Sequence, residues 1–103
     1  MKLRFAEQAE IEVAESWRWY EERRALVADE FLEELARVLR RIEDSPEQFP
    51  REETNRSSYD VRRCRLSRFP FRVIYQLRQV EVVVLAVAHN RRRPGYWRDR
   101  TVS

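Results

Sequence analysis

The second half of the chain is dense in arginine, the side chain best suited to bind phosphate or carboxylate through two parallel hydrogen bonds. Such a cluster predicts a surface for a polyanion or for an acidic partner segment. The alternative is a solvated sheet face that is kept charged against aggregation, and the density at residues 91–93 makes us favour binding. The arginines concerned are Arg62, Arg63, Arg65, Arg68, Arg72, Arg91, Arg92 and Arg93, with Arg98 and Arg100 behind them.

Few other side chains in this half could move a proton or stack on a base. His89 is the only histidine, and it could act as a general acid or base or cap the end of a strand, of which we favour the cap. Tyr96 and Trp97 could stack on a nucleic-acid base. Trp97 is predicted to be core instead, whereas Tyr96 could serve either purpose. Trp19 lies off the main apolar stripe of its segment and indicates a partner surface.

One glycine and one cysteine exclude several kinds of site. Gly95 alone cannot build a glycine-rich phosphate loop, and Cys64 alone allows neither an internal disulfide nor a cysteine zinc site. We therefore expect no cofactor and no metal. The first residues lack an apolar signal-peptide core, and the longest apolar run, residues 80–88, is far below the roughly 20 residues of a membrane helix. These features predict a cytoplasmic protein without a membrane segment.

Three strands are expected in the second half. Residues 80–88 are apolar on both alternating sets, which is typical of a central strand. Strict alternation places Val82, Val84 and Ala86 on one face and Val83, Leu85 and Val87 on the other. Residues 71–78 predict a half-exposed antiparallel neighbour, and residues 61–66 a further strand that directs Arg63 and Arg65 to one side.

Two amphipathic helices are expected before these strands, after a first strand at residues 2–5 along a sheet edge. Apolar side chains recur at three- and four-residue spacing through residues 6–44. The stripe loses phase around residues 22–27, and an unbroken helix of this length would have no partner in a small domain. We therefore predict a helical hairpin that ends at Ser45–Pro46, followed by a surface loop over residues 47–60.

The predicted architecture is a single α+β domain over residues 1–103: an N-terminal strand, an α-helical hairpin, then a three-stranded antiparallel sheet segment. The hairpin would cover one sheet face, leaving the arginines on the opposite face and the tail, with residues 99–103 frayed. Residues 1–55 carry 15 acidic and 9 basic side chains, whereas residues 56–103 carry 3 acidic and 12 basic. The sheet half therefore projects a positive field.

Three segments occur in an order found in one known family. They are residues 69–75 (FPFRVIY), 85–89 (LAVAH) and 92–97 (RRPGYW). This order resembles the RelE/ParE superfamily, the toxins of type II toxin–antitoxin systems, and the resemblance extends from Leu3 to Trp97. It implies a growth-inhibiting toxin that a cognate antitoxin neutralises.

Two mechanisms are implied by this resemblance. The RelE-like branch enters the ribosomal A site and cleaves messenger RNA by activating a ribose 2′-hydroxyl. On that reading the catalytic set would be Arg63, Arg65, Arg72, His89 and Tyr96, with a tail position among residues 91–93 completing it. On either branch, phosphate or a partner is expected to bind at Arg62, Arg68, Arg91, Arg92, Arg93 and Trp97. Arginine replaces the family's lysine at positions 63 and 65, and arginine is a poor general base.

The ParE-like branch makes no covalent chemistry; it binds DNA gyrase and stabilises its cleaved complex with DNA. This branch needs binding surfaces and no catalytic set, so arginine in place of lysine at positions 63 and 65 does not count against it. The two long amphipathic helices expected in this chain also resemble this branch more closely, and we therefore favour it. The expected partner is an antitoxin whose acidic C-terminal segment wraps the hairpin and the sheet in a hetero-oligomer. Outside the family, a basic nucleic-acid-binding module without toxicity remains an alternative.

Overall fold

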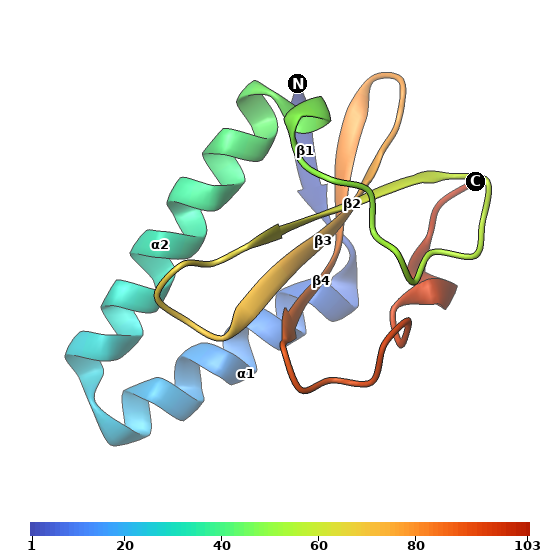
Figure 1. The fold of residues 1–103 in the computed structure, drawn as a ribbon. Coiled ribbons are helices and arrows are strands. Elements are labelled where there is room, and N and C mark those ends of the chain that lie inside the picture. Colours follow the sequence, from blue (N-terminus) through green and yellow to red (C-terminus); the bar gives the residue numbers. More distant parts are fainter.

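The computed structural model describes residues 1–103 and shows a helical hairpin packed on one face of a four-stranded sheet (Figure 1). The strands are β1 (Lys2–Phe5), β2 (Asp60–Arg65), β3 (Phe71–Leu77) and β4 (Glu81–His89), and the helices are α1 (Glu7–Arg23) and α2 (Ala25–Asp44). Short 3₁₀ turns occur at Pro46–Gln48 and Arg98–Arg100. The α+β class and the order of strand, hairpin and three strands are confirmed.

The sheet has the strand order β1-β4-β3-β2, so β4 is central, as its apolar sequence predicts. Strands β2, β3 and β4 pair antiparallel, whereas β1 lies at the edge and pairs parallel with β4, with Leu3 opposite Val82 and Phe5 opposite Val84. The sheet is therefore mixed. A parallel pair requires a long crossover connection, and the helices lie within the connection between these two strands.

The hairpin turns at Arg24, which ends α1 and begins α2. Its backbone is extended, with φ of −156° and ψ of 108°, and its N–H donates to the Tyr20 carbonyl at 2.7 Å. This confirms the predicted break around residues 22–27. Neither helix is long and apolar enough to cross a membrane.

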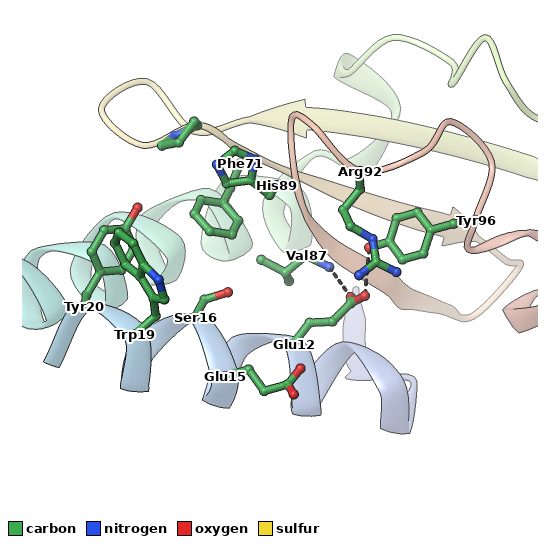
Figure 2. A pocket seen from close by; sticks show the side chains of 11 residues that line it. Glu12, Glu15, Ser16, Trp19, Tyr20, Phe71, Val87, His89, Arg92 and Tyr96 are labelled. Carbon is green, nitrogen blue, oxygen red and sulfur yellow. Dashed lines mark hydrogen bonds between the residues drawn. The ribbon is translucent and has the colours of Figure 1, made fainter. Parts of the chain in front are cut away.

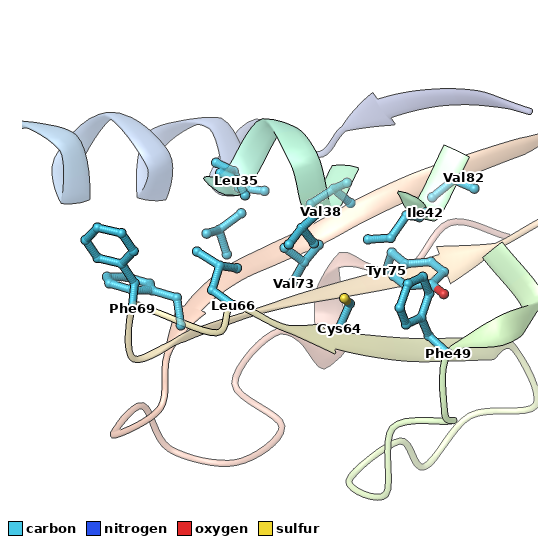
Figure 3. Close-up of a cluster of buried hydrophobic side chains, with 14 of the residues drawn as sticks. Leu35, Val38, Ile42, Phe49, Cys64, Leu66, Phe69, Val73, Tyr75 and Val82 are labelled. Carbon is cyan, nitrogen blue, oxygen red and sulfur yellow. The ribbon is translucent and has the colours of Figure 1, made fainter. Parts of the chain in front are cut away.

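The larger core lies between the hairpin and the sheet (Figure 3). The apolar stripe of α2 places Leu35, Val38 and Ile42 against Val73 and Tyr75 of β3, and the whole cluster contains 15 buried residues. Each such side chain stabilises the fold by about 1.5–3 kcal/mol when it is fully buried. Packing against the sheet therefore holds the helices in place.

Strand β4 contains a bulge that the sequence pattern does not reveal. Ile74 pairs with Ala86 and the next residue, Tyr75, pairs with Val84, so that Leu85 is an extra residue in β4. Ala86 consequently joins the face of Leu85, while Val87 joins the face of Val84. The strict alternation expected through residue 87 is therefore wrong beyond Leu85, because a bulge reverses the facing of every residue after it.

The second sheet face is covered by the chain that follows β4. Trp97 is fully buried there, in a cluster of seven residues that includes Ile74. Gln76 exchanges two hydrogen bonds with the backbone of Val102, at 2.7 and 2.8 Å. Strand β3 is therefore buried on both faces rather than half exposed, and residues 99–103 are held in place rather than frayed. The sequence pattern of β3 does not reveal this burial, because the residues that cover its second face come from the tail after β4.

Candidate functional site

A basic pocket lies at the end of β2 and β3, on the face that the tail only partly covers. Arg65 of β2 is directly opposite Arg72 of β3. With Arg63 and Arg92 they line a cavity of about 330 Å³. The remaining lining residues are Glu52, Glu53, Thr54, Asn90 and Pro94. The structure thus brings together four of the arginines predicted to form a site.

These arginines differ in how far their charge is already compensated. Arg63 donates to the Arg51 carbonyl at 2.7 Å and lies 3.7 Å from the Glu53 carboxylate. Arg72 donates only to the His89 carbonyl, at 3.4 Å, and the exposed Arg65 side chain forms neither a hydrogen bond nor an ion pair. Charge capable of binding an anion therefore remains on Arg65 and Arg72.

An apolar groove lies on the other side of the sheet, between α1 and the ends of β3 and β4 (Figure 2). It has a volume of about 530 Å³. Trp19 is 52% exposed at this groove, and the Arg23 guanidinium stacks 3.7 Å from the centre of its ring. The lining residues are Glu12, Glu15, Ser16, Trp19, Tyr20, Pro70, Phe71, Val87, His89, Arg92 and Tyr96. Trp19 thus lies on an open surface, as its position off the apolar stripe predicts.

His89 lies in the apolar groove and not in the basic pocket. Its ring meets Phe71 edge-on at 5.2 Å, and its Nδ1 accepts a hydrogen bond from the Arg91 N–H at 3.1 Å. The bulge at Leu85 is the cause, since without the extra residue the side chain at position 89 would face the arginines. The structure therefore separates the only histidine from Arg63, Arg65 and Arg72, whereas Arg92 lines both cavities and stacks its guanidinium 4.1 Å from the centre of the Tyr96 ring.

Tyr96 anchors the tail to α1 and to the bulge. Its hydroxyl donates to Glu12 at 2.7 Å, and the other Glu12 oxygen accepts from the Val87 N–H and from Arg100, each at 3.1 Å. Arg100 also donates to the carbonyl of Leu85 at 3.0 Å. Burial, and then the hydrogen bond to Glu12, raise the pKa of Tyr96 well above its ordinary value of 10.0. The phenol is held neutral and engaged, which makes it a poor proton donor to a substrate.

Two further arginines of the predicted patch form contacts within the fold and are not free to bind a ligand. Arg62 lies on the helix side of β2, where it pairs with Asp60 at 2.9 Å and donates to two carbonyls of the preceding loop. Arg68 pairs with Glu30 of α2 at 3.1 Å. Neither lines the basic pocket, because the pleat and the β2–β3 turn direct both side chains toward the hairpin.

The remaining predicted site residues divide between surface and core. Arg91 and Arg93 are exposed beside Arg92 but line neither cavity. Trp97 is completely buried, so its assignment to binding is wrong and its alternative assignment to the core is confirmed. Its ring covers the apolar side chains of the second sheet face and cannot stack on a ligand.

Sequence reasoning missed two carboxylates that hold the fold together. Glu12 ties the bulge to the tail, and the buried Glu34 accepts hydrogen bonds from the backbone N–H groups of Ser67 and Arg68 in the β2–β3 turn. Glu34 had a detectable signal, because it interrupts the apolar stripe of α2 with a charged group. Such a group is buried only when it has partners.

Comparisons with known proteins agree with this fold. The family model described as "ParE toxin of type II toxin-antitoxin system, parDE" matches residues 3–94. A solved chain described as "Chromosomal ParDE TA system from P. aeruginosa" has the same fold, with a TM-score of 0.72 and 16% identity, covering 86% of this chain and 95% of that chain. No match was found among curated protein sequences. Since the family model spans most of its length, the chain belongs to the ParE toxin family of type II toxin–antitoxin systems.

Proposed function

We propose that this protein is a cytoplasmic growth inhibitor that acts by binding DNA gyrase and stabilising its cleaved complex with DNA, without cleaving RNA. Membership of the ParE toxin family supports the toxin assignment. The observation that carries the choice between mechanisms is the separation of the proton-moving side chains from the basic pocket.

Cleavage of RNA at a ribose 2′-hydroxyl needs a general base beside the phosphate. His89 faces the apolar groove, and the Tyr96 hydroxyl is bound to Glu12. The two carboxylates at the rim of the basic pocket already have partners: Glu52 accepts hydrogen bonds from Thr54, and Glu53 pairs with an arginine. The pocket therefore supports binding of an anion better than proton transfer.

An antitoxin is the proposed partner, and the apolar groove is its proposed docking surface. The groove combines apolar walls with the half-exposed Trp19, and Arg23 and Arg92 flank it. An amphipathic segment with acidic side chains would match both features. We expect Trp19→Ala to weaken the complex by ten-fold or more, which is on the order of 1.4 kcal/mol or above, because exposed aromatic anchors dominate such interfaces.

The target is tested by expressing the chain alone and following DNA and protein synthesis in the same culture. Early loss of DNA synthesis, together with protein-linked DNA breaks when the purified protein is mixed with gyrase and plasmid, is the expected result. Early loss of protein synthesis that Arg72→Ala or Tyr96→Phe abolishes would contradict the proposal and identify a ribosome-dependent nuclease. A folded protein that does not affect growth would contradict the toxin proposal and leave a nucleic-acid-binding module without toxicity as the alternative.

The antitoxin proposal has its own test. A small acidic protein encoded beside this chain should restore growth when both are expressed, and should co-purify with the toxin. Failure of Trp19→Ala to change the affinity of that complex would show that the segment docks elsewhere.

A further inference from the structure

Each end of the apolar groove holds an arginine whose guanidinium stacks on an aromatic ring. At one end Arg23 lies 3.7 Å from the centre of the Trp19 ring. At the other end Arg92 lies 4.1 Å from the centre of the Tyr96 ring. Neither arginine forms an ion pair, and the only side-chain hydrogen bond of the two runs from Arg23 to the Trp19 carbonyl. Stacking orients each guanidinium, while its edge keeps N–H groups free for a carboxylate.

The spacing of these two charges is set by α1. The Tyr96 hydroxyl is bound to Glu12, so the Arg92 guanidinium that stacks on the Tyr96 ring lies level with Glu12 (Figure 2). Arg23 lies level with Trp19, on which it stacks. Glu12 and Trp19 are seven residues apart in α1, which is about two turns, or about 10 Å along the helix. The groove therefore offers two positive charges about two helical turns apart.

Between its two ends the groove has apolar walls and a negative rim. The apolar side chains there are those of Tyr20, Phe71 and Val87. Glu15 lies exposed on the α1 side of the groove and forms no ion pair. A partner carboxylate in the middle would lose water against apolar walls, and Glu15 would repel it. The groove therefore favours apolar side chains in the middle of its partner and acidic side chains at both ends.

The backbone around the groove favours a helix over an extended segment. An extended segment needs free backbone groups along a strand edge, because its own N–H and C=O groups are unpaired. Strand β3 lies between β2 and β4, and Glu12 takes the Val87 N–H where β4 runs past the end of β1. A helix satisfies its own backbone and needs only a matching side-chain face.

We propose that Arg23 and Arg92 select the docking segment by binding two carboxylates that lie two turns apart on one amphipathic helix. The expected pattern has acidic residues at positions i and i+7 and apolar residues at i+3 and i+4, since all four positions share one helix face. The inference rests on the proposed antitoxin function and adds the pattern by which the groove recognises its partner. A segment with the same net charge but another spacing binds more weakly.

The test measures the affinity between the purified full chain and the small acidic protein encoded beside it, by isothermal titration calorimetry. The variant Arg23→Gln/Arg92→Gln should bind about ten-fold or more weakly, because two charge-assisted contacts are lost. The matched control Arg18→Gln/Arg37→Gln removes the same charge from exposed helix positions that line neither cavity. Its affinity should stay within about two-fold of that of the unaltered chain. Thermal unfolding of each variant checks that the fold is intact.

The spacing is tested on the partner. Each acidic residue of its docking segment is changed to the matching amide, alone and together with Arg23→Gln or Arg92→Gln. Each arginine should couple to one carboxylate, so that removing both members of a pair costs little more affinity than removing one. The two coupled carboxylates should lie seven residues apart. Exchanging one of them with a polar residue two positions away, at unchanged net charge, should weaken binding as much as the amide does.

The possible results separate this inference from the antitoxin proposal. Equal loss of affinity in the two double variants would overturn the inference, because the effect would then follow net charge alone. Coupling to no carboxylate, or to two carboxylates at another spacing, would also overturn it, while the antitoxin proposal would stand. Absence of any complex between the unaltered chains would contradict the antitoxin proposal itself, and the inference with it.

Discussion

The two faces of the sheet are covered to different extents, and this difference decides which part of the sheet is open to solvent. Two helices cover one face and bury a cluster of 15 residues. The other face has a cluster of seven residues around Trp97 and is covered by the tail after β4, with Tyr59 of the loop before β2 packed against the same cluster (Figure 1). The shorter cover leaves the ends of β2 and β3 open to solvent, and the basic pocket lies there.

The same contrast appears in how polar groups are satisfied. On the helix face, the buried Glu34 carboxylate is bound by the β2–β3 turn, and the Tyr75 hydroxyl donates to the Pro46 carbonyl at 2.5 Å. Under the tail, Trp97 Nε1 is buried without a hydrogen-bond partner, and Arg65 at the edge of this face has no counterion. The buried polar groups named on the helix face are therefore satisfied, whereas an unpaired indole N–H and an uncompensated arginine remain on the tail face, at some cost in stability.

The largest expected effect comes from removing the cover of the tail face. Trp97→Ala should lower the free energy of unfolding by about 3–5 kcal/mol, because it opens a cavity over the smaller cluster. Trp97→Phe should cost much less, since the indole N–H makes no hydrogen bond that could be lost. Denaturant unfolding measures both. Equal destabilisation of the two variants would contradict the explanation that the packing of the aromatic ring stabilises this face.

The next largest loss of stability is expected from breaking the contacts of α1 with the tail and with β4. Glu12→Ala leaves the mostly buried Arg100 guanidinium unpaired and removes the acceptor of the Val87 N–H, so we expect a loss of about 2–4 kcal/mol. Arg100→Met in the same background should restore part of that loss, because it removes the uncompensated charge. A double variant as unstable as the sum of the two single variants would show that the pair is not coupled.

Unfolding at alkaline pH tests the raised pKa of one buried tyrosine on the helix face and of one in the tail. Burial raises the pKa of Tyr75, on the helix face, and of Tyr96, in the tail, above their ordinary value of 10.0. Above about pH 10 the unfolded chain loses these protons while the folded chain keeps them, so stability falls as the pH rises. Each tyrosine contributes up to about 1.4 kcal/mol per pH unit. Unfolding at several pH values should show a shallower decline for Tyr75→Phe and for Tyr96→Phe, and an unchanged slope in either variant would contradict its assignment.

The smallest effect is a gain. Arg65→Gln should raise the free energy of unfolding by a few tenths of a kcal/mol, and at most about 1, because it removes the repulsion across β2 and β3. The gain should shrink as salt is added, since screening weakens exposed charges. Arg37→Gln on α2 should change stability little at any salt concentration. A loss of stability in Arg65→Gln would mean that its charge is compensated in the folded state.

Local patterns determined most of the architecture. The doubly apolar run of β4 required a central strand, and the phase slip near Arg24 required a hairpin, because each depends only on the spacing of apolar residues along one element. The alternation of β2 likewise sent Arg63 and Arg65 to one side, and the structure places both in the basic pocket. The cluster of arginines could therefore be predicted as a region.

Which side chains meet in the site was decided by tertiary structure. A single extra residue in β4, held by Glu12 and Arg100, turned His89 away from the arginines, and no local signal marks it because Leu85 suits a strand on either face. The pairing of Arg65 with Arg72 depends on strand register, which a sequence pattern constrains only to the correct face. Periodicity reports the environment of one element, whereas the site arises where a bulge, a register and a returning tail bring distant segments together.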